Sequence, residues 1–161
     1  MGEQIDRAKT EARRARSLGK DAHCRVCHFA QSAALQRSAR GIICYEHANA
    51  AARRPTVEDH HPIGRANDSD TTVPTPGNMH RLLDARNAAW PMEVRTNPMH
   101  DPLTSIAQVT LAARDFSLVI ADYAQRIADW LLRLRDVLVT QFGDTWQIVL
   151  GLPPLWGEAA P

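Results

Sequence analysis

Long apolar runs and an apolar N-terminal segment are both missing from this chain of 161 residues. A membrane-spanning helix needs about 20 predominantly apolar residues, and the sequence contains no uninterrupted apolar run of that order. A secretory signal needs an apolar segment close to the N-terminus, where this chain is polar and charged. We therefore expect a cytoplasmic protein that neither enters a membrane nor is secreted.

Cysteine is also scarce, with three residues in the whole chain. So few thiols cannot form the disulfide framework that holds many small secreted domains together. We expect a reducing compartment, in which the thiols bind a metal instead.

The three cysteines and one histidine form two closely spaced pairs. Cys24-x2-Cys27 is followed, after sixteen residues, by Cys44-x2-His47. Tetrahedral structural zinc is typically held by two such pairs of soft or borderline ligands. We predict a structural Zn²⁺ site on these four residues, with no open position for water or substrate. His23 and His28 remain alternatives for the fourth ligand.

The net charge of +1 hides an asymmetry between the two parts of the chain. Residues 1–66 carry 12 Lys and Arg against 7 Asp and Glu, and residues 67–161 carry 7 against 11, which gives +5 and then −4. A basic N-terminal part is suited to phosphate contacts and to polyanions such as DNA. A solvated helical face is the alternative interpretation of the same charges.

Proline and glycine divide the chain into three predicted regions. Residues 1–21 contain a polar, basic helix over residues 3–18 that ends near Gly19. Residues 22–100 are broken into short elements by many turn-forming residues, and such a small domain usually needs a metal to complete its stability. Residues 101–161 begin with Asp101 as a helix N-cap and Pro102 at the first helical position.

The third region predicts a long helix, because neither proline nor glycine occurs between Pro102 and Gly143. Its apolar residues alternate steps of three and four, which is a heptad pattern. The pattern comprises Ile106, Val109, Ala113, Phe116, Ile120, Tyr123, Ile127, Trp130, Leu134 and Val137. Two interpretations remain open. The helix breaks near residues 113–115 into an antiparallel hairpin, or it stays whole and meets a partner in a homodimer or larger assembly. The apolar segment Trp146–Pro161 either docks on a partner or folds back over the heptad face.

Two further segments carry potential metal ligands and a potential general base. The first is Glu58-Asp59-His60-His61, which continues through Gly64 and Arg65, and the second is Asn78-Met79-His80 with Asp84 four residues later. In this order they resemble the HNH endonuclease family, also called the ββα-metal or His-Me finger fold, over roughly residues 22–95. The resemblance is closest to the phage and bacterial members with paired histidines. It implies an α+β fold with a small ββα-metal domain, here stabilised by zinc, and a nuclease activity on DNA.

The resemblance also implies roles for individual residues. His61 would be the general base, while His60, His80 and Asp84 would hold a divalent cation such as Mg²⁺, Mn²⁺ or Zn²⁺. Arg65, and beside it Arg81 and Arg86, would contact the scissile phosphate. An alternative register makes Asp59 the metal ligand and His60 the base.

The chain departs from the family at the asparagine that orients the base. The family places this residue between the paired and the final histidines, at a position that falls on Asp70 or Thr71 here, and Asn78 is a further candidate for the role. A second interpretation is therefore a zinc module that has lost catalysis and binds nucleic acid or protein. In a third, residues 101–161 alone act as a structural adaptor.

Overall fold

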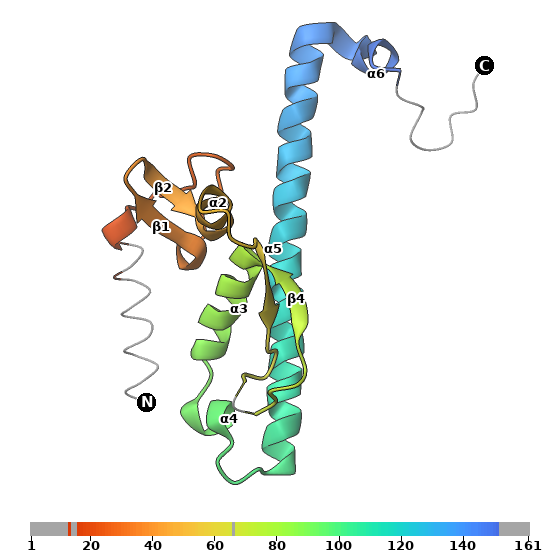
Figure 1. Cartoon of the computed structure of the whole chain (residues 1–161). Coiled ribbons are helices and arrows are strands. Elements are labelled where there is room, and N and C mark those ends of the chain that lie inside the picture. The colour runs from red at the N-terminus through yellow and green to blue at the C-terminus, as the bar shows by residue number, and fades with distance from the viewer. Residues whose placement is uncertain (1–12, 14–15, 66, 152–161) are drawn as a thin grey trace, which may run out of the picture. The chain divides into compact units, whose positions relative to one another are not determined.

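The computed structural model describes residues 13, 16–65 and 67–151 as two small antiparallel sheets and several helices, one of them long (Figure 1). The α+β class is therefore confirmed. The predicted N-terminal helix lies largely outside the described residues, and so do the last ten residues of the apolar tail. The chain divides after Val119 into two units, which are described separately.

The first sheet is a hairpin of β1 (Leu35–Ser38) and β2 (Gly41–Cys44), preceded by the 3-10 helix η1 (Ser32–Ala34). Its two-residue turn leads into Gly41, whose φ of 106° is accessible to glycine at little cost. Strand β2 passes directly into the short helix α2 (Tyr45–Ala51), with Cys44 at the junction. The cysteine that ends the strand and the histidine one turn into the helix are thereby held close together.

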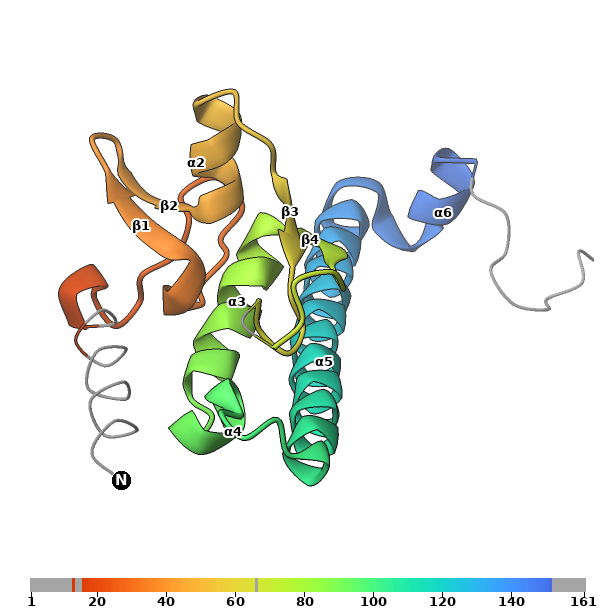
Figure 2. The ribbon, with the colours of Figure 1, turned by 60° about the horizontal axis from the view of Figure 1, so that its bottom comes forward.

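The second sheet pairs β3 (Val57–His60) with β4 (Val73–Pro76), and helix α3 (Gly77–Ala88) follows β4 without a linker. Both views in Figures 1 and 2 show this hairpin alongside α3. Along β3, alternate residues point to the same side of the sheet. Glu58 and the buried His60 therefore share one side, while Asp59 is exposed on the other.

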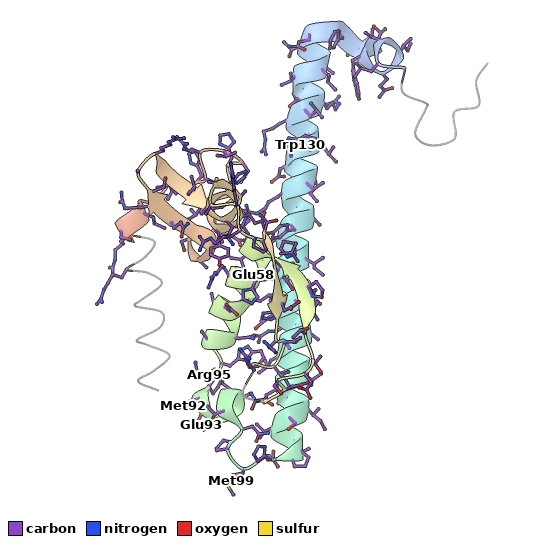
Figure 3. The ribbon with its side chains drawn as sticks, viewed as in Figure 1. Glu58, Met92, Glu93, Arg95, Met99 and Trp130 are labelled. Atoms are coloured by element: carbon purple, nitrogen blue, oxygen red, sulfur yellow. The ribbon has the colours of Figure 1, made fainter. Side chains whose placement is uncertain are left out.

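The loop between β3 and β4 is held at defined points. The Asn67 side-chain amide donates to the carbonyl oxygens of Ile63 and Arg95, at 2.8 and 2.7 Å. The Asn87 amide donates to the carbonyl of Pro62 at 3.2 Å. These bonds tie the segment after His61 to α3 and to the short helix α4 (Met92–Thr96), near which Arg95 is labelled in Figure 3.

The long helix α5 runs from Pro102 to Phe142. Asp101 accepts the Thr104 N–H at 2.6 Å, which confirms the predicted N-cap. The helix continues through residues 113–115, so the hairpin interpretation is wrong. It fails because those residues contain neither proline nor glycine, and because the Asp115 carboxylate is used in packing rather than in a turn.

The face that α5 buries differs from the predicted heptad face. Its buried residues are Gln108, Ala112, Asp115 and Val119. The buried Trp90 indole donates to Asp115 Oδ2 at 2.8 Å, and Gln108 donates to the Val94 carbonyl at 2.6 Å. Polar groups thus anchor the first part of α5 to the first unit. The apolar heptad positions Val109, Ala113 and Phe116 instead line an open groove of about 540 Å³ with Ile63 and Val73.

The second unit contains the remainder of α5, the 3-10 turn η2 (Gly143–Thr145) and the short helix α6 (Trp146–Val149). None of its described residues, 120–151, is buried. The helical stretch Pro102–Val149 is long enough and apolar enough to cross a membrane, judged by its length and composition alone, with a mean hydropathy of 1.2 in its most apolar part. That finding qualifies the expectation drawn from the absence of an unbroken apolar run.

Candidate metal centres

The first centre brings together the four residues of the predicted zinc set. Cys44 Sγ lies 3.0 Å from His47 Nδ1, Cys24 Sγ lies 3.7 Å from the same nitrogen, and the sulfurs of Cys27 and Cys44 are 3.8 Å apart. All four ligand atoms lie within 4.8 Å of one another. The group could therefore hold a metal such as zinc.

The segment around Cys24 and Cys27 is a tight turn that presents both thiols. The Cys24 N–H donates to the Phe29 carbonyl at 2.7 Å, and the His28 N–H donates to the Cys24 carbonyl at 2.8 Å. Burial raises the pKa of the Cys24 thiol. Hydrogen bonds from the backbone N–H groups of Cys27, Cys44 and Val26 outweigh that effect, so the pKa falls to about 6. A thiolate is the form that binds metal, so the turn favours that form at Cys24. Burial, with the neighbouring Cys24 and Cys44, instead raises the pKa of Cys27 to about 12.

His47, rather than its alternatives, completes this group. His23 Nδ1 donates to the Asp21 carbonyl at 2.9 Å, and the His23 and His28 rings stack on each other with centroids 5.4 Å apart. Both of these histidines are exposed, whereas His47 projects from α2 toward the thiols.

The second centre lies where β3 meets α3. The ligand atoms of His60, His80 and Asp84 are within 4.8 Å of one another. His60 Nδ1 is 3.7 Å from Asp84 Oδ1, and His80 Nδ1 is 3.5 Å from Asp84 Oδ2. The two imidazoles meet edge to face at 5.1 Å. His80 and Asp84 share a face of α3 because they are four residues apart.

Glu58 joins this cluster, although no role was predicted for it individually. Its Oε2 lies 3.2 Å from His80 Nδ1, and its Oε1 accepts the Tyr45 hydroxyl at 2.7 Å. Figure 3 labels Glu58 beside α3. Strand alternation was the available signal, because it places Glu58 on the same side of β3 as His60.

Some histidine ring nitrogens of this centre remain available to bind a ligand. Among the described residues, the buried Nδ1 atoms of His60 and His61 have no hydrogen-bond partner. Burial, with the neighbouring His80, lowers the pKa of His60. Its imidazole is therefore neutral at pH 7, which is the form that coordinates a metal.

His61, the predicted base, follows β3 directly and is half-buried. The nearby loop turns at Asp68, whose carboxylate accepts the backbone N–H groups of Asp70 and Thr71 at 3.0 and 2.9 Å. Hydrogen bonds from Thr71, and more weakly the charge of His61, lower the pKa of Asp68. Asp68 thus organises the turn through Asp70 and Thr71, and the charge of its carboxylate is felt at His61.

Asn78 lies elsewhere than the sequence suggested. Its Oδ1 accepts the Glu46 N–H at 3.1 Å, while its own N–H donates to Glu46 Oε1 at 3.0 Å. This reciprocal pair joins the start of α3 to the first turn of α2, so the amide bridges the two centres rather than contacting His61.

The three arginines have different environments. Arg65 is exposed on the loop after His61, and Arg86 is half-buried on α3. The Arg81 guanidinium lies over the Tyr45 ring, 4.1 Å from its centroid. Arg81 is therefore held beside the residue that donates to Glu58, close to the second centre.

Compared with known proteins, the chain matches no family model, no curated protein and no solved structure.

Proposed function

We propose that this protein is a metal-dependent endonuclease of the HNH type that hydrolyses phosphodiester bonds in DNA. One observation carries the proposal. A two-stranded hairpin followed directly by a helix gathers His60, His80 and Asp84 within 4.8 Å, and His61 is the next residue after His60. Ligands and base are thereby adjacent on a short, fixed framework.

The residues of this centre fit a divalent cation. Two imidazoles and a carboxylate suit a borderline metal, and the buried Nδ1 of His60, which has no hydrogen-bond partner, is available as a ligand. The Asp84 side chain is 47% exposed, so the cluster opens to solvent on one side. A cation held there would stabilise negative charge on the leaving 3′ oxygen. Glu58 fixes the His80 ring, as supporting carboxylates do for metal-binding histidines.

His61 takes the proton from the attacking water in this proposal. A neutral imidazole is a suitable general base near pH 7. Its Nδ1 is buried while the residue is half-exposed, so other ring atoms face solvent. Asp68 supports the protonated ring after transfer through its negative charge.

Basic side chains supply the contacts to DNA. Arg65 follows His61 by four residues, and Arg81 is oriented by the Tyr45 ring. A guanidinium can bind phosphate through two hydrogen bonds. The excess of positive charge in residues 1–66 adds attraction to the duplex that does not depend on sequence.

The exposure of Asp59 supports the register in which His60 is the ligand. Asp59 is on the opposite side of β3 from the cluster, and His60 is within it. His60→Ala is then expected to weaken metal binding at the second centre, whereas His61→Ala is expected to spare it. If His60→Ala keeps the metal and loses turnover, the Asp59–His60 register is the correct one.

The test is cleavage of supercoiled plasmid with Mg²⁺, Mn²⁺ or Zn²⁺. The wild-type protein is expected to relax or linearise the plasmid, and His61→Ala to lose at least 100-fold in rate because a general base is removed. His100→Asn is the matched control, since His100 is exposed and has a φ of 51° that asparagine tolerates. No metal-dependent cleavage by the wild type with any of the three cations would refute the enzyme.

A second candidate is a zinc module that has the same framework without catalysis. The hydrogen bonds between Asn78 and Glu46 favour this candidate, because Asn78 is then engaged by α2 and is not the amide that orients the base. This candidate predicts a metal content of one tightly bound zinc, with binding to DNA or to a protein but no cleavage.

A further inference from the structure

The strongest unassigned feature is an uncovered apolar face on the part of α5 after Val119. We propose that this face binds the same face of a second copy of the chain and forms a homodimer. The distal seam is defined as Ile120, Tyr123, Ile127, Trp130, Leu134 and Val137. Oligomerisation of this kind is independent of the proposed nuclease function.

Apart from the half-buried Tyr123, the distal seam is exposed among the described residues. Ile127, Trp130 and Val137 are 56%, 55% and 51% exposed, and Figure 3 shows Trp130 projecting from the helix. Helices in proteins gain most of their stability by packing an apolar face, and contiguous apolar surface of this kind marks an interface.

The spacing of the seam fits another helix with the same repeat. Its residues alternate steps of three and four without interruption, which is the repeat that keeps a seam facing a partner helix along a left-handed supercoil. Ala124, Leu131 and Leu138, each next to a seam residue, widen the apolar face. A second copy has the identical repeat, so the two seams match along their full length.

The charges of this helix favour a second copy over a charged partner. Between Ile120 and Phe142 there are three arginines and three aspartates, and none of the six is a seam residue. Their sum is zero, so the helix offers no net attraction to nucleic acid, to an anionic lipid surface or to a strongly charged protein. Six charges also oppose insertion across a bilayer, despite the length and apolar composition of the stretch.

The flanking residues add a preference for parallel helices. Arg126 and Arg133 precede seam residues on one edge, while Leu131 and Leu138 follow seam residues on the other. In a parallel pair, each arginine lies beside a leucine of the partner, whose surface its aliphatic part can cover. An antiparallel pair would instead place arginine against arginine.

The experiment measures the mass of the full chain by sedimentation and light scattering from about 1 to 100 μM, without DNA. The wild type is expected to be a dimer, and Ile127→Glu with Leu134→Glu to weaken association at least 100-fold, as loss of two central seam contacts should. Leu132→Glu is the matched control. Leu132 is 59% exposed but lies outside the seam, so this variant is expected to remain dimeric.

Zinc content and circular dichroism of each variant report whether the first unit is still folded. The two substituted positions, Ile127 and Leu134, are exposed in the single chain. A wild type that is monomeric at 100 μM would overturn the proposal. So would dissociation of Leu132→Glu together with retention of the dimer in the double variant. A monomeric wild type could instead bind phosphatidylcholine vesicles, with binding abolished in the double variant. That result would assign the seam to lipid and would also overturn the homodimer proposal.

Discussion

At the scale of the single residue, Gly77 shows how closely the second hairpin approaches the zinc-binding part of the chain. Its N–H donates to the Thr56 carbonyl at 2.7 Å. A Cβ at this position would lie 2.9 Å from the Tyr45 ring and 3.2 Å from the Thr56 carbonyl oxygen. The start of α3 can therefore reach Tyr45 only if residue 77 lacks a side chain.

We expect Gly77→Ala to destabilise the protein by about 1 to 3 kcal/mol, the usual cost of forcing an extra methyl group into a packed contact. Urea denaturation gives the change in the free energy of unfolding. In a Tyr45→Ala background the ring is gone, so the same substitution should cost clearly less. Equal costs in the two backgrounds would show that the ring does not limit residue 77.

At the scale of the element, the stability of α5 depends in part on the cap at its first turn. Asp101 accepts hydrogen bonds from Thr104, and they lower the pKa of this carboxyl below its ordinary value of 3.8. Because the folded pKa is the lower one, the carboxylate stabilises the helix above the unfolded pKa. That contribution disappears as the pH falls through the folded pKa.

Asp101→Asn should retain a cap without this titration. Melting temperatures of both proteins between about pH 6 and pH 3 would test it, since the contribution follows from the pKa difference between the two states. The wild type is expected to lose its advantage over the variant at the acid end of the range. Metal loss at low pH affects both proteins alike, so the difference between them isolates Asp101. A constant difference across the range would contradict the assignment.

The elements also show what the sequence could and could not predict. The start of the long helix and its cap followed from local signals, namely the absence of proline and glycine and the Asp101-Pro102 pair. The same signals left open whether the helix breaks near residues 113–115. The group of three cysteines and His47 followed from short spacings along the chain, whereas the group of His60, His80 and Asp84 followed from the resemblance to the HNH endonucleases. Which face of α5 is buried depends on contacts distant in sequence, and the Trp90 bond to Asp115 left no local pattern. Apolar periodicity therefore indicated the uncovered face of α5 instead of the buried one. The contact of Asn78 with Glu46 was missed for the same reason, since it also joins residues distant in sequence.

For the molecule as a whole, the described core of the first unit is small. A metal held by Cys24, Cys27, Cys44 and His47 would add the stability that a larger core provides. Removal of the metal by a strong chelator is expected to unfold β1, β2 and α2, because three thiols and an imidazole would be left clustered without their common ligand. Circular dichroism and limited proteolysis within residues 22–51 would report this change.

The Glu46–Asn78 pair links the two centres, so chelation is also expected to change metal binding at the second centre. Loss of α2 removes the partner of Asn78 at the start of α3, so the affinity of His60, His80 and Asp84 for Mn²⁺ should fall as well. Glu46→Gln, with zinc still bound, is expected to weaken Mn²⁺ binding less than chelation does. Unchanged Mn²⁺ affinity after zinc removal would show that the two centres are independent.

Strand β4 has two prolines, Pro74 and Pro76, which lie opposite Asp59 and Val57. The prolines alternate with Val73, Thr75 and Gly77, and the Gly77 N–H donates toward β3, to the Thr56 carbonyl. The missing donors of Pro74 and Pro76 therefore belong to the outer edge of the strand. An incoming strand would find no N–H groups there to extend the sheet, and this protects a two-stranded sheet against edge-to-edge aggregation. The protein can thus be concentrated for the mass measurements without growth through this edge.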